Sequence, residues 1–178
     1  MNQVAHWIMN QAKDYFLDIE HIYGVGDSAG AHLLTLYASI LTNREYASTY
    51  SFKAPEGFHF NALELNCGVY NITSESELTG ALMKEYLPLG GLEEEFKEID
   101  PKQYITSDFP PCFVMTAEWD FLVEDALTMS QVLTHHNVPH MYKYYVGDQP
   151  LNHVFHCNIR LKEATQCNNE ECEFFKTY

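Results

Sequence analysis

Basic residues are scarce in this sequence, which has 10 lysines and arginines against 25 aspartates and glutamates over 178 residues. The formal net charge is −15 at pH 7. Such a chain repels phosphate groups, so we expect neither a nucleic-acid partner nor an anionic membrane partner. The sequence also lacks an apolar run long enough to span a bilayer, and its first residues lack the basic and apolar segments of a secretion signal. These absences predict a cytoplasmic protein.

Cysteines are few and odd in number: Cys67, Cys112, Cys157, Cys167 and Cys172. An odd count, with two members in apolar strand-like runs, is typical of reduced thiols in a cytosolic protein. The last two cysteines could bind a metal ion together with His153 or His156. No zinc-binding spacing is matched, however, and a pair of surface thiols is the simpler interpretation. We therefore expect no metal site.

Apolar periodicity predicts alternating helices and strands. We expect helices over residues 3–17, 29–42, 121–136 and 152–175, and strands over 21–26, 60–67, 112–117 and 140–146. The segment 43–57 is interpreted as a surface connection. The irregular segment 70–111, with short helices expected near 75–86 and 92–99, is interpreted as a cap-like insert that could cover the site. This order predicts one α/β domain over residues 1–178, with a mostly parallel sheet and helices on both faces.

The most informative stretch is Gly26-Asp27-Ser28-Ala29-Gly30, which matches the G-x-S-x-G pattern of a nucleophile elbow. A short β-prone run precedes it, and a strongly apolar helical run follows it. Gly26 and Gly30 would leave room for the strand to pack on the helix. Ser28 would then stand at a helix N-terminus, where free N–H groups favour negative charge. The other interpretation is a glycine-rich turn with a capping serine.

A serine hydroxyl needs a base that takes its proton and an acid that orients the base. In hydrolases with this motif the chain order is serine, acid, histidine, each beyond the carboxyl end of a strand. Asp120 is the candidate acid, because it follows the strand 112–117 and precedes a helix. The rivals are Glu118, Glu124 and Asp125; the last two fall in a first helical turn and are more simply residues that complement the helix dipole.

The candidate base is His153, in the loop between the last strand and the last helix. His156 is its main rival in the same loop. His32 lies one turn beyond Ser28 and is better interpreted as a packed helix histidine. The remaining histidines lie before the last strand or in earlier elements, where the expected chain order does not place the base.

Four stretches together resemble one family: Gly26–Gly30, Pro110-Pro111 before a strand, Ala117-Glu118-Trp119-Asp120-Phe121-Leu122, and His153-Val154-Phe155. They resemble the hormone-sensitive-lipase-like branch of the α/β-hydrolase fold, which includes bacterial acetyl esterases and carboxylesterases. The resemblance implies Ser28 as nucleophile, Asp120 as acid and His153 as base, with the Ala29 backbone N–H in the oxyanion hole. It implies short acyl esters as small-molecule substrates and no metal or organic cofactor. The family usually has glycine at the position of Val154.

The family's His-Gly-Gly-Gly-type oxyanion loop has no counterpart in this sequence. By resemblance, the first four strands are also absent, so we expect an N-terminally truncated α/β-hydrolase fold. Loss of one oxyanion donor lowers the rate by about a hundred- to a thousandfold. The elbow strand would lie at an exposed sheet edge, which predicts either a homodimer or a longer protein.

Three functions remain to be weighed. The first is a serine carboxylesterase that acts through an acyl-serine intermediate. The second is a catalytically impaired remnant of the same fold that serves as a binding module, which the missing oxyanion loop motivates. A thiol-based enzyme is disfavoured, because no cysteine occupies an elbow.

Overall fold

The computed structural model describes residues 1–77 and 79–178 and contains one parallel sheet with the strand order β1-β2-β3-β4. The strands are β1 (Tyr23–Asp27), β2 (Ala62–Asn66), β3 (Cys112–Ala117) and β4 (His140–Tyr145). Every neighbouring pair is parallel, with Val25 opposite Glu64 and Leu65 opposite Val114. The carboxyl ends of all four strands therefore meet at one edge of the sheet, and the predicted α/β class is confirmed.

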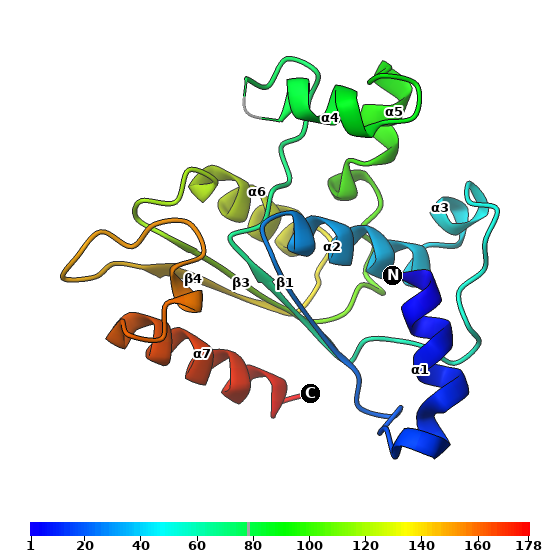
Figure 1. Ribbon diagram of the computed structural model, residues 1–178, viewed down its shortest axis with the longest axis horizontal. Coiled ribbons are helices and arrows are strands. Elements are labelled where there is room, and N and C mark those ends of the chain that lie inside the picture. The colour runs from blue at the N-terminus through cyan, green and yellow to red at the C-terminus, as the bar shows by residue number, and fades with distance from the viewer. Residues whose placement is uncertain (78) are drawn as a thin grey trace.

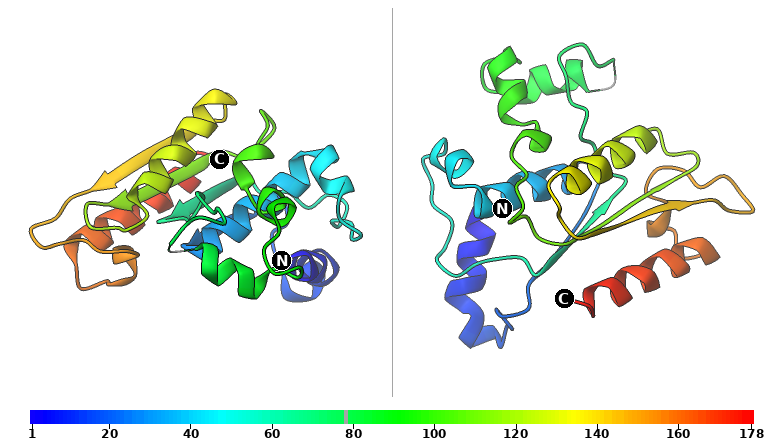
Figure 2. Two further views of the ribbon diagram at one scale, coloured as in Figure 1. Left: turned by 90° about the horizontal axis from the view of Figure 1, so that it is seen from above. Right: turned by 180° about the vertical axis from the view of Figure 1, so that it is seen from behind.

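Helices cover both faces of this sheet. They are α1 (Asn2–Tyr15), α2 (Ala29–Thr42), α3 (Arg44–Ser48), α4 (Gly80–Tyr86), α5 (Glu93–Glu98), α6 (Val123–His135) and α7 (Lys162–Phe175), with 3₁₀ turns η1 (Pro101–Gln103) and η2 (Phe155–Cys157). Figures 1 and 2 show α2 and α6 on one face and α7 on the other. In the described part of the chain, no helix combines the length and apolarity needed to cross a membrane.

Each face of the sheet has its own apolar core, because successive strand side chains point to opposite faces. Leu63 and Leu65 of β2 pack with Met129 and Leu133 of α6 on one side. Phe113 and Met115 of β3 pack with Cys167 and Phe174 of α7 on the other. All six residues of β3 are buried, as expected for a continuous apolar strand that is covered on both faces.

The last helix begins later than the sequence predicts. The expected helix 152–175 is present only as α7, and a loop and η2 occupy the first ten positions. Val154 has a φ of 53°, a left-handed conformation that does not continue a right-handed helix. The Trp119 N–H donates to the carbonyl of Leu151 at 3.1 Å, which holds this loop beside the end of β3. His153 therefore lies on a fixed loop.

The described residues of the segment 70–111 form no strand, and the segment carries α4, α5 and η1. Figure 1 shows α4 and α5 beyond α2 and α6, away from the sheet. The helix expected over 75–86 is represented by α4, and Leu78, within that range, lies outside the described residues. The surface connection expected over 43–57 contains α3, whose first turn is capped by the Asn43 side chain, which accepts from the Tyr46 N–H at 3.0 Å.

The outer edge of β1 is open. Among the strands of the described residues, β1 pairs only with β2, and the side chain of Val25 is 62% exposed. A hollow of about 380 Å³, lined mainly by apolar residues of α1, α2 and β1, lies beside this edge. The sequence-based expectation of an exposed edge at the elbow strand therefore agrees with the structure.

Candidate active site

Ser28 lies in the sharp turn that joins β1 to α2. Its φ of 55° and ψ of −120° form a strained conformation for a residue with a side chain, and such strain is typical of a nucleophile elbow. The Ser28 N–H donates to the carbonyl of Asn66 at 2.9 Å, which ties the turn to the end of β2. Because α2 begins at Ala29, the side chain of Ser28 stands at a helix N-terminus.

Gly26 is the glycine on which this turn depends. A Cβ at Gly26 would come within 2.7 Å of the backbone carbonyl carbon and oxygen of Gly30, too close for any side chain. A Cβ at Gly30 would meet nothing within 4 Å. The close approach of strand and helix expected from the motif thus requires glycine at position 26, whereas the space beside Gly30 is open.

Asp120 and His153 are in direct contact. His153 Nδ1 lies 2.8 Å from Asp120 Oδ1, although the residues are 33 positions apart. Asp120 follows β3, and its carboxylate is fully buried, whereas the His153 side chain is 17% exposed. The same carboxylate accepts the Thr116 hydroxyl on Oδ2 at 2.8 Å and the Leu122 N–H on Oδ1 at 3.0 Å. Its orientation is therefore fixed from three sides.

The Asp120 carboxyl is held in its ionised form. Burial alone would raise its pKa, but hydrogen bonds from the Leu122 N–H, the Cys67 thiol, His153 and the Thr116 hydroxyl outweigh burial and lower the pKa. An ionised carboxylate next to Nδ1 keeps the proton of a neutral imidazole on that nitrogen. The other ring nitrogen, Nε2, is then free to accept a proton.

Ser28 borders a hollow that adjoins this pair. The hollow, of about 220 Å³, is lined by Ser28, Ala29, His32, Val69, Ile72, Thr79, Leu82, Met83, Phe121 and Leu122. The Phe121 ring also packs against the His153 imidazole, with ring centroids 4.4 Å apart. In the described part of the chain, no hydrogen bond joins the Ser28 hydroxyl to His153. Phe121, which packs on His153, and Leu122, whose N–H donates to Asp120, both line the hollow and thus connect it to the Asp120–His153 pair.

The rival acids have other contacts. Glu118 Oε1 accepts the Gly147 N–H at 3.4 Å. Asp125 was interpreted from the sequence as a residue that complements the helix dipole, but in the structure it binds the chain after β2. Its carboxylate accepts the backbone N–H groups of Tyr70 and Asn71 at 2.5 and 2.8 Å, and the Asn71 side chain as well. Asp125 therefore anchors the chain that leaves β2.

The rival histidines are buried and have other hydrogen-bond partners than Asp120. His32 lines the hollow, and its Nε2 lies 2.7 Å from the carbonyl of Ile99. Burial lowers the pKa of His32. Burial also lowers the pKa of His156, whose Nε2 lies 3.6 Å from the Cys157 thiol. Neither ring shares a hydrogen bond with Asp120.

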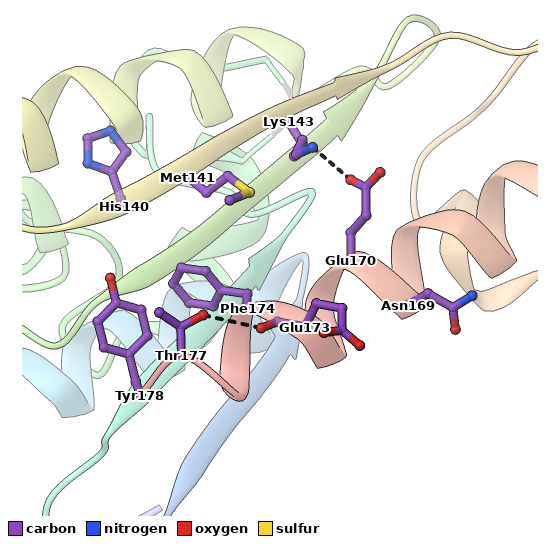
Figure 3. Close-up of a pocket in the computed structure, with 9 residues that line it drawn as sticks. All are labelled: His140, Met141, Lys143, Asn169, Glu170, Glu173, Phe174, Thr177 and Tyr178. Carbon is purple, nitrogen blue, oxygen red and sulfur yellow. Dashed lines mark hydrogen bonds and ion pairs between the residues drawn. The ribbon is translucent and has the colours of Figure 1, made fainter.

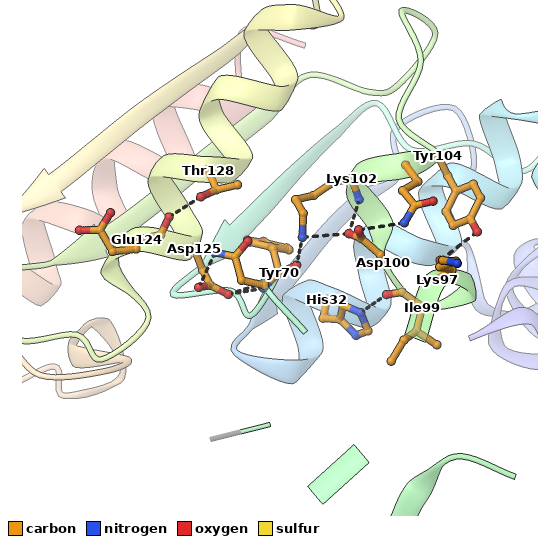
Figure 4. A network of polar contacts seen from close by, with 12 residues as sticks. His32, Tyr70, Lys97, Ile99, Asp100, Lys102, Tyr104, Glu124, Asp125 and Thr128 are labelled. Atoms are coloured by element: carbon orange, nitrogen blue, oxygen red, sulfur yellow. Dashed lines mark hydrogen bonds and ion pairs between the residues drawn. The ribbon is translucent and has the colours of Figure 1, made fainter. Parts of the chain in front are cut away.

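A polar network, shown in Figure 4, links the segment 70–111 to α2 and α6. Asp125 of α6 holds Tyr70, and the Lys102 ammonium donates to the Tyr70 carbonyl and pairs with Asp100 at 2.9 Å. The bond from His32 to Ile99 adds a contact from α2. This network fixes the segment that supplies Ile72, Leu82 and Met83 to the wall of the hollow. Sequence reasoning missed it, because the bonds that tie the segment together, from Asp125 to Tyr70, from Lys102 to Tyr70 and from His32 to Ile99, join residues distant in the chain.

The aromatic residues of the segment 70–111 do not line the hollow. Tyr70 and Phe109 are buried in the core between the sheet and α6. Tyr104 stacks on Tyr46 with centroids 3.6 Å apart, and Tyr86 is 73% exposed. Of the two roles left open by the sequence, core packing or pocket lining, the first holds for Tyr70 and Phe109.

A larger hollow of about 530 Å³ lies between β4 and α7 and is separate from Ser28 (Figure 3). Its wall carries an ion pair between Lys143 and Glu170 with a 2.9 Å separation. None of the residues discussed as nucleophile, acid or base lines it.

The potential metal ligands that lie together in the structure are not the pair Cys167 and Cys172 considered from the sequence. Cys167 is buried, with its thiol 3.4 Å from Glu171 Oε1, so the interpretation as two surface thiols holds only for Cys172. Among the described residues, the one group of three potential ligands is Cys67, Asp120 and His153, whose donor atoms all lie within 4.8 Å of one another.

Comparison with known proteins identifies the family and its relatives. The model of the family described as BD-FAE matches residues 1–136. The acetyl esterase of Salmonella paratyphi B is 28% identical over 186 residues, which cover 97% of this chain and 54% of the relative. The acetyl esterase of Salmonella typhi is 26% identical over 192 residues. The chain spans about half the length of the curated relatives it matches.

Solved structures show the same fold. Esterase B from Lactobacillus rhamnosis, inhibited by a C4-C4 tributyrin phosphonate, superposes with a TM-score of 0.83 at 23% identity, over 96% of this chain and 56% of that one. An esterase from Pyrobaculum calidifontis superposes with a TM-score of 0.71 at 22% identity, over 98% of this chain and 58% of that one.

Proposed function

Because the chain belongs to the BD-FAE family and has the α/β-hydrolase fold, we propose that it acts as a serine carboxylesterase on small-molecule, short-chain acyl esters. The observation that carries the proposal is the 2.8 Å contact between His153 and the buried Asp120 carboxylate, next to a hollow bordered by a serine in a strained elbow. The two acetyl esterases named above support the class of substrate.

In this proposal Ser28 is the nucleophile and His153 the base. The Ser28 hydroxyl gives its proton to Nε2 of His153 as its oxygen attacks the acyl carbon. The Ala29 backbone N–H donates to the oxyanion that forms. His153 then gives the proton to the leaving alkoxide, which departs as the alcohol. Water, activated by His153, hydrolyses the acyl-serine, and Asp120 stabilises the imidazolium in both steps.

The segment 70–111 serves as a cap in the same proposal. It supplies three apolar residues, Ile72, Leu82 and Met83, to the hollow beside Ser28, and Val69 directly before it supplies a fourth. A mainly apolar hollow of about 220 Å³ suits a short acyl chain. The alternative function, a remnant that only binds partners, would need none of the carboxylate–imidazole geometry, and no separate observation favours it.

Labelling with a fluorophosphonate tests the proposal. Such a probe reacts with a serine only when a base activates its hydroxyl, so we expect stoichiometric labelling of the peptide that contains Ser28. Mass spectrometry of a digest identifies the labelled residue. Heat-denatured protein is the control and should stay unlabelled, because unfolding separates Ser28 from His153. A label on another serine, or none on folded protein, would contradict the proposal and favour the remnant.

We also propose that the open edge of β1 pairs with a second copy of the chain. An exposed apolar residue on a strand with one open edge, here Val25 of β1 at 62% exposure, promotes edge-to-edge pairing. Sedimentation equilibrium should then give twice the chain mass of 20.6 kDa, and Val25→Lys should shift the protein to the monomer. Met141→Lys, on the opposite edge strand β4, is the matched control and should leave the dimer intact. A monomeric wild-type chain at every concentration would disprove this pairing.

A further inference from the structure

Cys67 lies next to the Asp120–His153 pair, and the proposed hydrolysis does not use its thiol. It directly follows β2 and has a φ of 46°, a left-handed conformation that a residue with a side chain rarely adopts. Its side chain is completely buried. Its sulfur lies within 4.8 Å of an Asp120 oxygen and a His153 ring nitrogen. The turn after β2 thus brings a third donor atom to the pair.

These three donors match the ligand preferences of one cation. Thiolate sulfur, imidazole nitrogen and carboxylate oxygen are the groups that bind Zn²⁺ in proteins. Bond lengths of about 2.0–2.3 Å in a tetrahedral site place neighbouring ligand atoms about 3.3–3.8 Å apart. The separations here reach no more than 4.8 Å, and His153 Nδ1 is 2.8 Å from Asp120 Oδ1. Small side-chain movements would therefore complete three of the four positions.

We propose that Cys67, Asp120 and His153 form a binding site for Zn²⁺ and that occupation of this site switches off the candidate triad. The metal replaces the Cys67 thiol proton, which leaves to solvent, and binds Nδ1 of His153. The proton of the neutral imidazole moves from Nδ1 to Nε2. An Nε2 that carries a proton cannot accept one from Ser28, so the base is lost. The binding step stands on these three residues alone, whereas the inhibition rests on the proposed esterase function.

The other thiols must be removed before binding is measured. Cys157 and Cys172 are exposed, and the Cys157 sulfur lies 3.6 Å from His156 Nε2, so either could capture metal. The parent protein for the test is therefore the double variant Cys157→Ser/Cys172→Ser. Cys67→Ala in this background removes the sulfur ligand, and His153→Gln removes the nitrogen ligand at a partly exposed position.

Spectroscopy with Co²⁺ tests the site without any need for activity. The parent should bind one equivalent of Co²⁺ with a thiolate-to-cobalt charge-transfer band, and excess Zn²⁺ should abolish the band. Cys67→Ala should lack the band, and His153→Gln should bind Co²⁺ more weakly. A parent without the band, or a band that persists in Cys67→Ala, would overturn the site. Circular dichroism establishes that each variant is folded; if Cys67→Ala is not, the His153→Gln comparison decides.

The inhibition is measured by the labelling rate at Ser28 with and without Zn²⁺. A positioned base typically contributes a hundredfold or more, so saturating Zn²⁺ should slow labelling of the parent about a hundredfold, reversibly with a chelator. The ratio of the two rates should be close to one in Cys67→Ala. Equal slowing in both proteins would overturn the switch. Absence of labelling without metal would count against the esterase proposal, while the cobalt band would still decide the binding site.

Discussion

Replacement of Asp120 by asparagine is expected to lower the rate of fluorophosphonate labelling at Ser28 by about 10⁴-fold, with a similar loss in ester hydrolysis. The carboxylate accepts from Nδ1 of His153 at 2.8 Å and is ionised, so it fixes the imidazole tautomer and stabilises the imidazolium. Asparagine keeps the size of the side chain and still offers one oxygen to Thr116 or Leu122. It lacks the negative charge, and its amide group can donate to Nδ1, which would place the ring proton on Nε2.

The control for this prediction is Glu118→Gln. Glu118 lies two residues away and is one of the three rival acids in the sequence, but its carboxylate accepts the Gly147 N–H, at 3.4 Å, and not a histidine. Its replacement should leave the labelling rate within a factor of about three. Ser28→Ala supplies the background rate. If Glu118→Gln lowers the rate as much as Asp120→Asn does, the acid has been assigned to the wrong residue.

Local patterns in the sequence are enough to predict the sheet and most of the helices. The apolar run Cys112–Ala117 is β3 to the residue, and the predicted helix 29–42 is α2. Both have strong periodicity and sharp boundaries. The last helix differs, because the left-handed backbone at Val154 depends on how the loop docks beside β3 rather than on helix propensity. The predicted start at residue 152 was therefore wrong by ten positions.

The candidate site likewise has one part that local sequence predicts and another that depends on tertiary contacts. The elbow is predictable, because a tight turn restricts residues 26 and 28 through local sterics. Local sequence cannot decide between His153 and His156, because both lie in one loop. Only the tertiary fold brings His153 to Asp120. The anchoring role of Asp125 is equally hidden, because its partners lie 54 and 55 residues away. Long-range contacts of this kind leave no periodic signal in a single sequence.

A second buried carboxylate predicts how stability depends on pH. Glu64 lies in β2, is 3% exposed and faces Glu171 of α7, which is 6% exposed. Burial and the charge of Glu171 raise the pKa of Glu64 to about 8. One oxygen of Glu64 has no hydrogen-bond partner among the described residues, and the hydrogen bond with Glu171 also raises the pKa of Glu64. The folded protein therefore binds a proton there that the unfolded chain, with an ordinary glutamate pKa, has lost.

The free energy of unfolding should consequently fall as the pH rises from about 5 towards 8. One extra proton in the folded state gives a slope of about 1.4 kcal/mol per pH unit, or about 3 kcal/mol between pH 5 and pH 7.5. The sign follows because the folded state binds more protons than the unfolded state over this window. Burial also raises the pKa of Glu171, which adds to this slope. Burial lowers the pKa values of His32 and His156, which adds an opposite slope near pH 6, so the wild-type curve is the sum of all these effects.

The variant Glu64→Gln isolates the carboxyl contribution. Glutamine has the same size and cannot ionise, so the variant's free energy of unfolding lacks the loss caused by Glu64. In urea unfolding, the difference in free energy of unfolding between Glu64→Gln and wild type should be about 3 kcal/mol larger at pH 7.5 than at pH 5. Glu163→Gln is the matched control, since Glu163 is a buried glutamate in α7 whose carboxylate lies 3.7 Å from the Lys162 ammonium. Its curve should run parallel to wild type. Parallel curves for wild type and Glu64→Gln would instead mean that Glu64 titrates alike in both states, because water or another donor reaches its carboxylate in the folded protein.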